Sequence, residues 1–263
     1  MCRWVAYRGR PVFLEDIVTK PCHSLIHQAL HAEEAKTETN GDGFGVGWYG
    51  DRHEPGLYRE TLPAWSDENL RHISHHVRAS LFFAHVRAST GTGTSRSNCH
   101  PFAFGPWMFM HNGQIGGWAQ LRRRVEAMIP DHHYTARQGT TDSEALFLVA
   151  QAAVPAASPV EAMADALARV HALMLADSIK APLRFSAAMT DGTDLYAFRW
   201  SSDSAAPTVY FSEADGDITV VSEPIDRVRE RWHEVPPGHA LVARRDKQAE
   251  IVAFDPLARA MAA

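Results

Sequence analysis

The sequence is poor in cysteine, with three among 263 residues. An odd number this small cannot form a disulfide framework, so the sequence predicts reduced thiols. It also lacks an excess of positive charge, because 26 lysines and arginines stand against 31 aspartates and glutamates, for a net charge of −5. Without a strong basic field to gather phosphates, nucleic acid is not an expected partner.

Long apolar runs are missing as well. The least interrupted stretch, 146–157, contains Gln151 and Pro155 and is shorter than the roughly 20 residues of a bilayer span. The first residues, MCRWVAYR, do not combine a basic start with an apolar core, as a secretory signal would. We therefore expect a cytoplasmic protein with no membrane partner.

The hydrophobic patterning is that of an ordinary folded protein, with 45% hydrophobic and 22% charged residues. Period-two alternation predicts strands early and late in the chain, and helical periodicity predicts helices mainly between them. Runs of each element indicate an α+β fold in which helices cover antiparallel sheets, and no linker interrupts a single domain over 1–263. The strands are expected at 2–7, 43–49, 81–87, 107–111, 183–189, 194–200, 208–212, 218–222, 239–244 and 250–254, and the helices at 24–31, 67–78, 117–128, 142–153 and 159–176.

Cys2 directly follows the initiator methionine. Removal of Met1 would place a thiol with a pKa of about 8.5 and an α-amine with a pKa of about 7.7–8.0 on one residue. Such a residue combines a nucleophile with its own general base. The alternative is that Cys2 is a small apolar residue at the start of a buried strand.

Two further segments carry groups suited to a small polar substrate. Arg87 ends a predicted strand and enters a polar loop, where it could bind a carboxylate bidentately or simply lie on the surface. Asn112-Gly113 follows a strand. This dipeptide is typical of a hairpin turn, and it also offers a side-chain amide and a backbone N–H as a two-donor oxyanion hole.

A predicted helix start supplies an acidic group. Thr141 and Glu144 have the spacing of a capping box, with Asp142 in the first turn. Asp142 either serves the helix dipole or accepts from a substrate ammonium. The neighbours Cys99 and His100 point to opposite faces of an extended chain and make a poor thiol–imidazole pair.

Two further patterns do not fit a functional site. The glycine-dense segment 40–48 has no following helix, so it does not fit a phosphate loop. His72, His75 and His76 lack the carboxylate or cysteine spacing of a metal site and are expected on a solvated helix surface. We predict neither a metal nor a cofactor.

Taken in chain order, these motifs resemble the class II glutamine amidotransferases, a branch of the N-terminal nucleophile hydrolases. The resemblance extends through segments 220–224 and 232–239, which are similar to small stand-alone members of the class. It implies a four-layer αββα sandwich. The motifs are the Met1-Cys2 start, His85-x-Arg87-x-x-Thr90, Asn98-x-His100-Pro101, His111-Asn112-Gly113 and Thr141-Asp142-Ser143-Glu144.

The resemblance implies a catalytic set. Cys2 would attack the side-chain carbonyl of a glutamyl group, with its own amine as base and then as acid. Asn112 and Gly113 would stabilise the oxyanion.

It also implies a substrate-binding set. Arg87, helped by Thr90, would hold the α-carboxylate, Asp142 would accept from the α-ammonium, and His100 would play a supporting role. Gly91 stands where well-known members of the class have a histidine.

The implied activity is hydrolysis of glutamine or of another γ-glutamyl amide through a thioester. One alternative is a glutaminase subunit that delivers ammonia to a separate synthase partner. The others are an amidase of the same superfamily acting on different acyl groups, and a catalytically silent sandwich.

Overall fold

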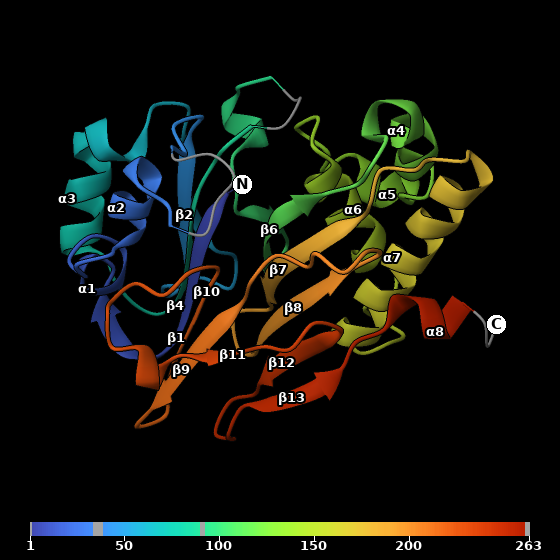
Figure 1. Ribbon diagram of the computed structural model, residues 1–263. Helices are drawn as coiled ribbons and strands as arrows, with labels where there is room; N and C mark the ends of the chain where they lie inside the picture. The colour runs from blue at the N-terminus through green and yellow to red at the C-terminus, as the bar shows by residue number, and fades with distance from the viewer. Residues whose placement is uncertain (1, 34–38, 90–92, 261–263) are drawn as a thin grey trace.

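The computed structural model describes residues 2–33, 39–89 and 93–260. Two sheets lie face to face, with one group of helices outside the first sheet and another outside the second (Figure 1). The α+β, four-layer αββα sandwich is therefore confirmed.

The first sheet has seven antiparallel strands in the order β11-β9-β10-β1-β4-β2-β3. Its outer face packs on three short helices through a cluster that includes Val5, Leu25 and Leu70. The strands are β1 (Arg3–Phe13), β2 (Phe44–Trp48), β3 (Gly56–Glu60), β4 (Arg78–Val86), β9 (Tyr210–Ala214), β10 (Asp217–Val221) and β11 (His233–Glu234), and the helices are α1 (Glu15–Val18), α2 (Leu25–Leu30) and α3 (Glu68–His76).

The second sheet has six antiparallel strands in the order β13-β12-β8-β7-β6-β5. A large apolar cluster, with Phe147 and Leu167 among its members, joins its outer face to the second helix layer. The strands are β5 (Phe102–Phe104), β6 (Trp107–Gln114), β7 (Arg184–Thr190), β8 (Leu195–Ser201), β12 (His239–Ala243) and β13 (Glu250–Ala253), and the helices are α4 (Trp118–Glu126), α5 (Asp131–Tyr134), α6 (Asp142–Gln151), α7 (Pro159–Ala176) and α8 (Pro256–Ala260).

A third cluster fills the space between the sheets. Trp4 and Phe83 from the first sheet meet Met108 and Met110 from the second there. Because successive side chains of a strand point to opposite faces, Val5 lies under the helices while Trp4 points to the other sheet. This alternation sets the side-chain directions at the start of β1 and at the ends of β4 and β6, whereas the register of β1 shifts between Arg8 and Val12.

The strands and helices predicted from the sequence all have counterparts at closely similar positions. The start of α7 is a capping box, in which Ser158 Oγ accepts from Glu161 N (3.3 Å) and the Glu161 carboxylate accepts from Ser158 N (3.1 Å). Short elements such as β3 and β5 were not predicted, because their few residues show no clear periodicity.

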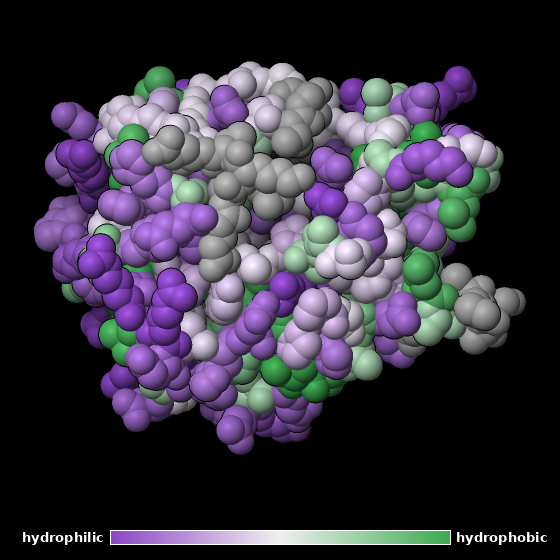
Figure 2. Space-filling model, viewed as in Figure 1, coloured by the Kyte–Doolittle hydropathy of each residue, from purple (hydrophilic) through white to green (hydrophobic). Residues whose placement is uncertain are grey.

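No helix among the described residues is both long and apolar enough to cross a membrane. Figure 2 shows a largely hydrophilic face, on which apolar side chains gather in small patches, the clearest of them near β12 and β13.

Candidate functional site

Cys2 lies at the end of the first sheet, immediately before β1. The pairing of Arg3 with Val86 places it opposite the residues that follow β4. Its Sγ lies 3.4 Å from the backbone N and 3.5 Å from the backbone O of Ala88. Two residues before the inward-pointing Trp4, the Cys2 side chain faces the space between the sheets.

The surroundings of Cys2 favour the neutral thiol. Burial raises the pKa of the Cys2 thiol, and the hydrogen bond from the Ala88 backbone opposes that rise only in part. A thiolate is therefore not the resting form near neutral pH. A nucleophilic role for this thiol requires a base close enough to remove its proton during attack.

Arg87 is buried, with 3% of its surface exposed, so the alternative of a surface arginine is wrong. Two residues after the inward-pointing His85, it faces the same space as Cys2. Its guanidinium donates to the backbone O of Asp42 (3.3 Å) and to Ser89 Oγ (3.1 Å). These contacts fix the direction of the guanidinium at the end of β4.

Asp42 organises this loop, although no motif in the sequence singles it out. Its carboxylate accepts from Ser89 N at 2.7 Å, and its own backbone N donates to Arg87 O at 3.0 Å. The glycine-dense segment around Asp42 is the sequence feature that could have pointed to this loop. The glycines allow close approach, since a Cβ at Gly45 would collide with the backbone O of His100.

Asn112 and Gly113 do not form a hairpin turn, and that prediction is wrong. They continue β6 and pair with Ser186 and Phe185 of β7. The preference of Asn-Gly for turns is overridden here by antiparallel pairing with the neighbouring strand.

The side chain of Asn112 points to the first sheet, because it keeps the direction of Met108 and Met110 on the same strand. It is 2% exposed, and within the described part of the chain its amide makes no hydrogen bond. The next position, Gly113, has no room for a side chain, because a Cβ there would collide with the backbone O of Arg184.

Asp142 is the first residue of α6 and is bound to the end of β6. Its Oδ2 accepts from Ile115 N and its Oδ1 from Ser143 N, both at 2.8 Å. Thr141 caps the helix by accepting from Glu144 N. The reciprocal half of the predicted capping box is wrong, because the Glu144 carboxylate binds Arg137 instead.

Three buried histidines connect the two sheets beneath this site. His85 of β4 stacks on His100 with ring centroids 4.2 Å apart, and its Nε2 lies 3.4 Å from the backbone O of His111 on β6. His111 Nδ1 in turn lies 2.8 Å from Ser143 Oγ on α6. Cys99 does not pair with His100, because its Sγ contacts backbone carbonyls.

Burial lowers the pKa of all three imidazoles, that of His85 to about 3, so the neutral forms dominate near pH 7. In the unfolded chain their pKa returns to about 6.5. Stability is then fully present above about pH 6.5 and is lost as the pH falls, since the unfolded state binds the extra protons. Between pH 6.5 and 5.5 His85 alone should cost about 1 kcal/mol, and His100 and His111 should add to the loss in the same direction.

Urea unfolding at both pH values would measure this loss. His85→Gln should reduce the pH dependence by about 1 kcal/mol over this range, whatever its effect on absolute stability. An unfolding free energy that is the same at both pH values would contradict the assignment of neutral histidines.

The structure directs Cys2 and Arg87 from the first sheet and Asn112 from the second into the space between the sheets. Asp142 is bound just beyond the end of the strand that carries Asn112. His100 is buried and packs against His85 of β4. Thr90 and Gly91 lie outside the described residues, so their predicted positions stay predictions.

Comparison with known proteins gives a consistent result. The family described as "Glutamine amidotransferases class-II" matches residues 13–206. A solved structure from Silicibacter pomeroyi, described as a glutamine aminotransferase class-II domain protein, is 42% identical, covers 97% of this chain and all of its own, and has a TM-score of 0.78. A glutamine phosphoribosylpyrophosphate amidotransferase from B. subtilis, 14% identical with a TM-score of 0.65 over 97% of this chain and 49% of its own, shares the fold.

Two curated relatives match shorter segments. The probable glutamine amidotransferase DUG3 of Saccharomyces cerevisiae is 38% identical over 56% of this chain and 44% of its own length. The γ-glutamyl-hercynylcysteine sulfoxide hydrolase of Mycolicibacterium smegmatis is 32% identical over 44% of this chain and 52% of its own. The matches therefore span about half the length of these relatives.

Proposed function

This chain belongs to the class II glutamine amidotransferases, and from that premise we propose that it hydrolyses a small γ-glutamyl amide through a thioester on Cys2. The proposal is supported by the direction of Cys2, Arg87 and Asn112 into the space between the sheets. β4 and β6 meet at this point, since His85 Nε2 lies 3.4 Å from the backbone O of His111, and Asp142 is bound just beyond the end of β6. These groups supply a nucleophile, a cation, a neutral donor and an anion.

The proposed reaction uses the amine that Cys2 gains when Met1 is removed. The amine takes the thiol proton as Sγ attacks the side-chain carbonyl carbon, and the carbonyl electrons move to its oxygen. Asn112 Nδ2–H and Gly113 N–H stabilise that oxyanion. Collapse breaks the C–N bond, and the amine passes the proton to the leaving nitrogen. Water, deprotonated by the same amine, then releases glutamate and free Cys2.

The proposed recognition of the glutamyl group uses two opposite charges. Arg87 binds the α-carboxylate, helped by Thr90, and Asp142 accepts from the α-ammonium. Both side chains are already held by backbone groups, so little freedom is lost on binding. His100 supports the site from behind through its contact with His85.

This scheme does not determine the leaving group of the substrate, because the proposed contacts recognise only its glutamyl part. The mycobacterial relative is named a hydrolase of a γ-glutamyl conjugate, which favours an amine larger than ammonia. Hydrolysis is preferred because the proposed groups suffice for acylation and deacylation. Transfer of ammonia to a separate synthase is the alternative.

A panel of γ-glutamyl amides with leaving groups of increasing size, glutamine included, should separate these cases. We expect the purified chain to release glutamate from at least one conjugate faster than from glutamine. The measurement is enzymatic detection of free glutamate, with the matching α-glutamyl amides as controls. Release only from glutamine, and only after a cell extract is added, would favour the ammonia donor.

A further inference from the structure

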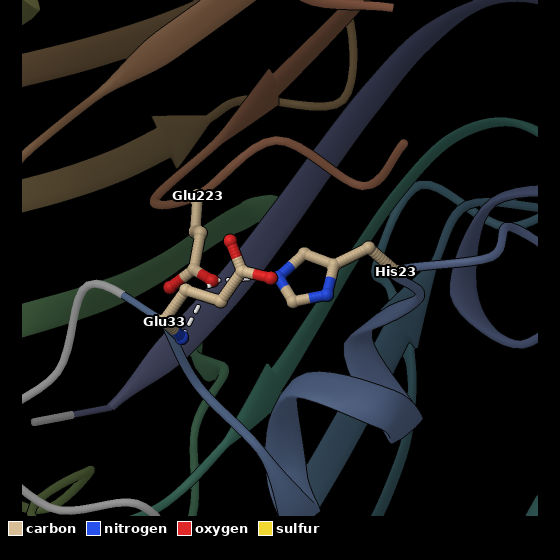
Figure 3. A group of neighbouring side chains, drawn as sticks. All are labelled: His23, Glu33 and Glu223. Carbon is tan, nitrogen blue, oxygen red and sulfur yellow. Dashed lines mark hydrogen bonds and ion pairs between the residues drawn. The ribbon is translucent and has the colours of Figure 1, made fainter. Parts of the chain in front are cut away.

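A second cluster of polar side chains lies on the opposite face of the first sheet from Cys2. His23 precedes α2, Glu33 follows it, and Glu223 follows β10, and the three side chains converge (Figure 3). His23 Nε2 lies 2.6 Å from Glu223 Oε1, which also accepts from Glu33 N at 3.0 Å. One nitrogen or oxygen atom from each side chain lies within 4.8 Å of the others.

The cluster borders a cavity of about 400 Å³. The Glu223 side chain is 2% exposed and that of His23 is 12% exposed, while Glu33 is exposed. Two of the three groups are thus held in place by the fold, and the third can adjust from the surface. The cavity leaves room for water beside them.

Charges of both signs surround the cluster, since Asp226, Arg227 and Arg229 also line the cavity. Arg3 Nε lies 2.7 Å from Glu223 Oε2, and both side chains are almost fully buried. This ion pair compensates one of the two carboxylates and directs Oε1 to His23 and Glu33. An imidazole and a second carboxylate then remain to face the cavity, and no cation in the described part of the chain pairs with that second carboxylate, Glu33.

We propose that His23, Glu33 and Glu223 bind a divalent transition metal ion of the Zn²⁺ class. Imidazole nitrogen and carboxylate oxygen are ordinary zinc ligands, and tetrahedral bonds of about 2.1 Å set ligand atoms about 3.4 Å apart. His23 Nε2 and Glu223 Oε1 now lie 2.6 Å apart, and all three ligand atoms lie within 4.8 Å of one another, so small side-chain shifts reach that spacing. The ion replaces the hydrogen bond between His23 and Glu223, and water completes its coordination.

Arg3 acts as the outer partner that orients a ligand. It also connects the metal site to the proposed nucleophile, because its Nη1 donates to the backbone O of Cys2 at 3.2 Å. A bound ion therefore fixes the start of β1 through Glu223 and Arg3. The site has no counterpart in a sequence motif, since its ligands lie 190 residues apart in the chain.

The test is Zn²⁺ binding by the full chain after treatment with a chelator, in a Cys2→Ala background that removes the active-site thiol. Titration calorimetry should show one site that Glu33→Gln weakens at least about tenfold and that His23→Gln abolishes. Co²⁺ should bind at the same site and give the visible absorption of a tetrahedral complex. Glu33 is exposed, so the chelated Glu33→Gln variant should unfold at the same temperature as its parent.

Two controls separate this site from surface binding. Glu68→Gln removes an exposed carboxylate on α3, and His72→Ala removes an exposed imidazole there. Neither should change the affinity for Zn²⁺. The proposal is overturned if no Zn²⁺ binds, or if binding survives both Glu33→Gln and His23→Gln. The binding readout is independent of the reaction proposed at Cys2.

Discussion

Cys2→Ala should lower the rate of γ-glutamyl amide hydrolysis by at least about a thousandfold. The substitution removes the atom that would form the thioester, and no other group at the site replaces it. The fold should survive, since the Sγ contacts with Ala88 are long ones at 3.4 and 3.5 Å. The measurement is kcat/KM on the best substrate of the panel, with the unfolding temperature as a check on folding.

Cys22→Ala is the matched control, because Cys22 is exposed and lies outside the proposed site. Its activity should equal that of the parent. Cys2→Ser should retain a trace of activity at most, since a hydroxyl is a poorer nucleophile than a thiol near neutral pH. Full activity in Cys2→Ala would exclude the thioester mechanism.

Arg87→Ala or Asp142→Asn should each lower kcat/KM by about 30-fold or more. Removing one partner of a desolvated, charge-assisted contact costs about 2–5 kcal/mol, and the loss should be seen with every γ-glutamyl substrate, whatever its leaving group. Asp142→Asn keeps an oxygen that can accept from Ile115 N, so its effect reports the lost charge more than a lost helix contact.

Steady-state kinetics on one γ-glutamyl amide would measure both effects. Arg123→Ala removes an exposed arginine from α4 and should be neutral. Arg87→Lys keeps the charge without the bidentate geometry and should fall between Arg87→Ala and the parent. Near-parental activity in both Arg87→Ala and Asp142→Asn would show that these charges do not bind the glutamyl group.

Elements were predicted correctly where the apolar periodicity agrees with the positions of capping and turn residues. The capping residues around Ser158 set the start of α7 to the residue, and Asp191-Gly192 separates β7 from β8. Short elements could not be read in this way. β5 has three residues, and it is held by pairing with β6 rather than by any local preference.

The site was readable in part. The sequence singles out Arg87 and Asn112. It does not predict that Arg87 is buried or that Asn112 continues a strand. Both depend on long-range pairing between β2 and β4 and between β6 and β7. Asp42 was not predicted for the same reason, since its carboxylate binds the backbone of Ser89, 47 residues later in the chain.

The most direct test of the central claim is covalent labelling with a diazo-ketone analogue of glutamine, followed by peptide mass mapping. Intact mass first establishes that Met1 has been removed. We expect one adduct per chain, on Cys2, formed at the rate at which hydrolysis is lost and slowed by a competing γ-glutamyl substrate. An adduct on Cys22 or Cys99, or complete loss of hydrolysis with Cys2 unmodified, would contradict it.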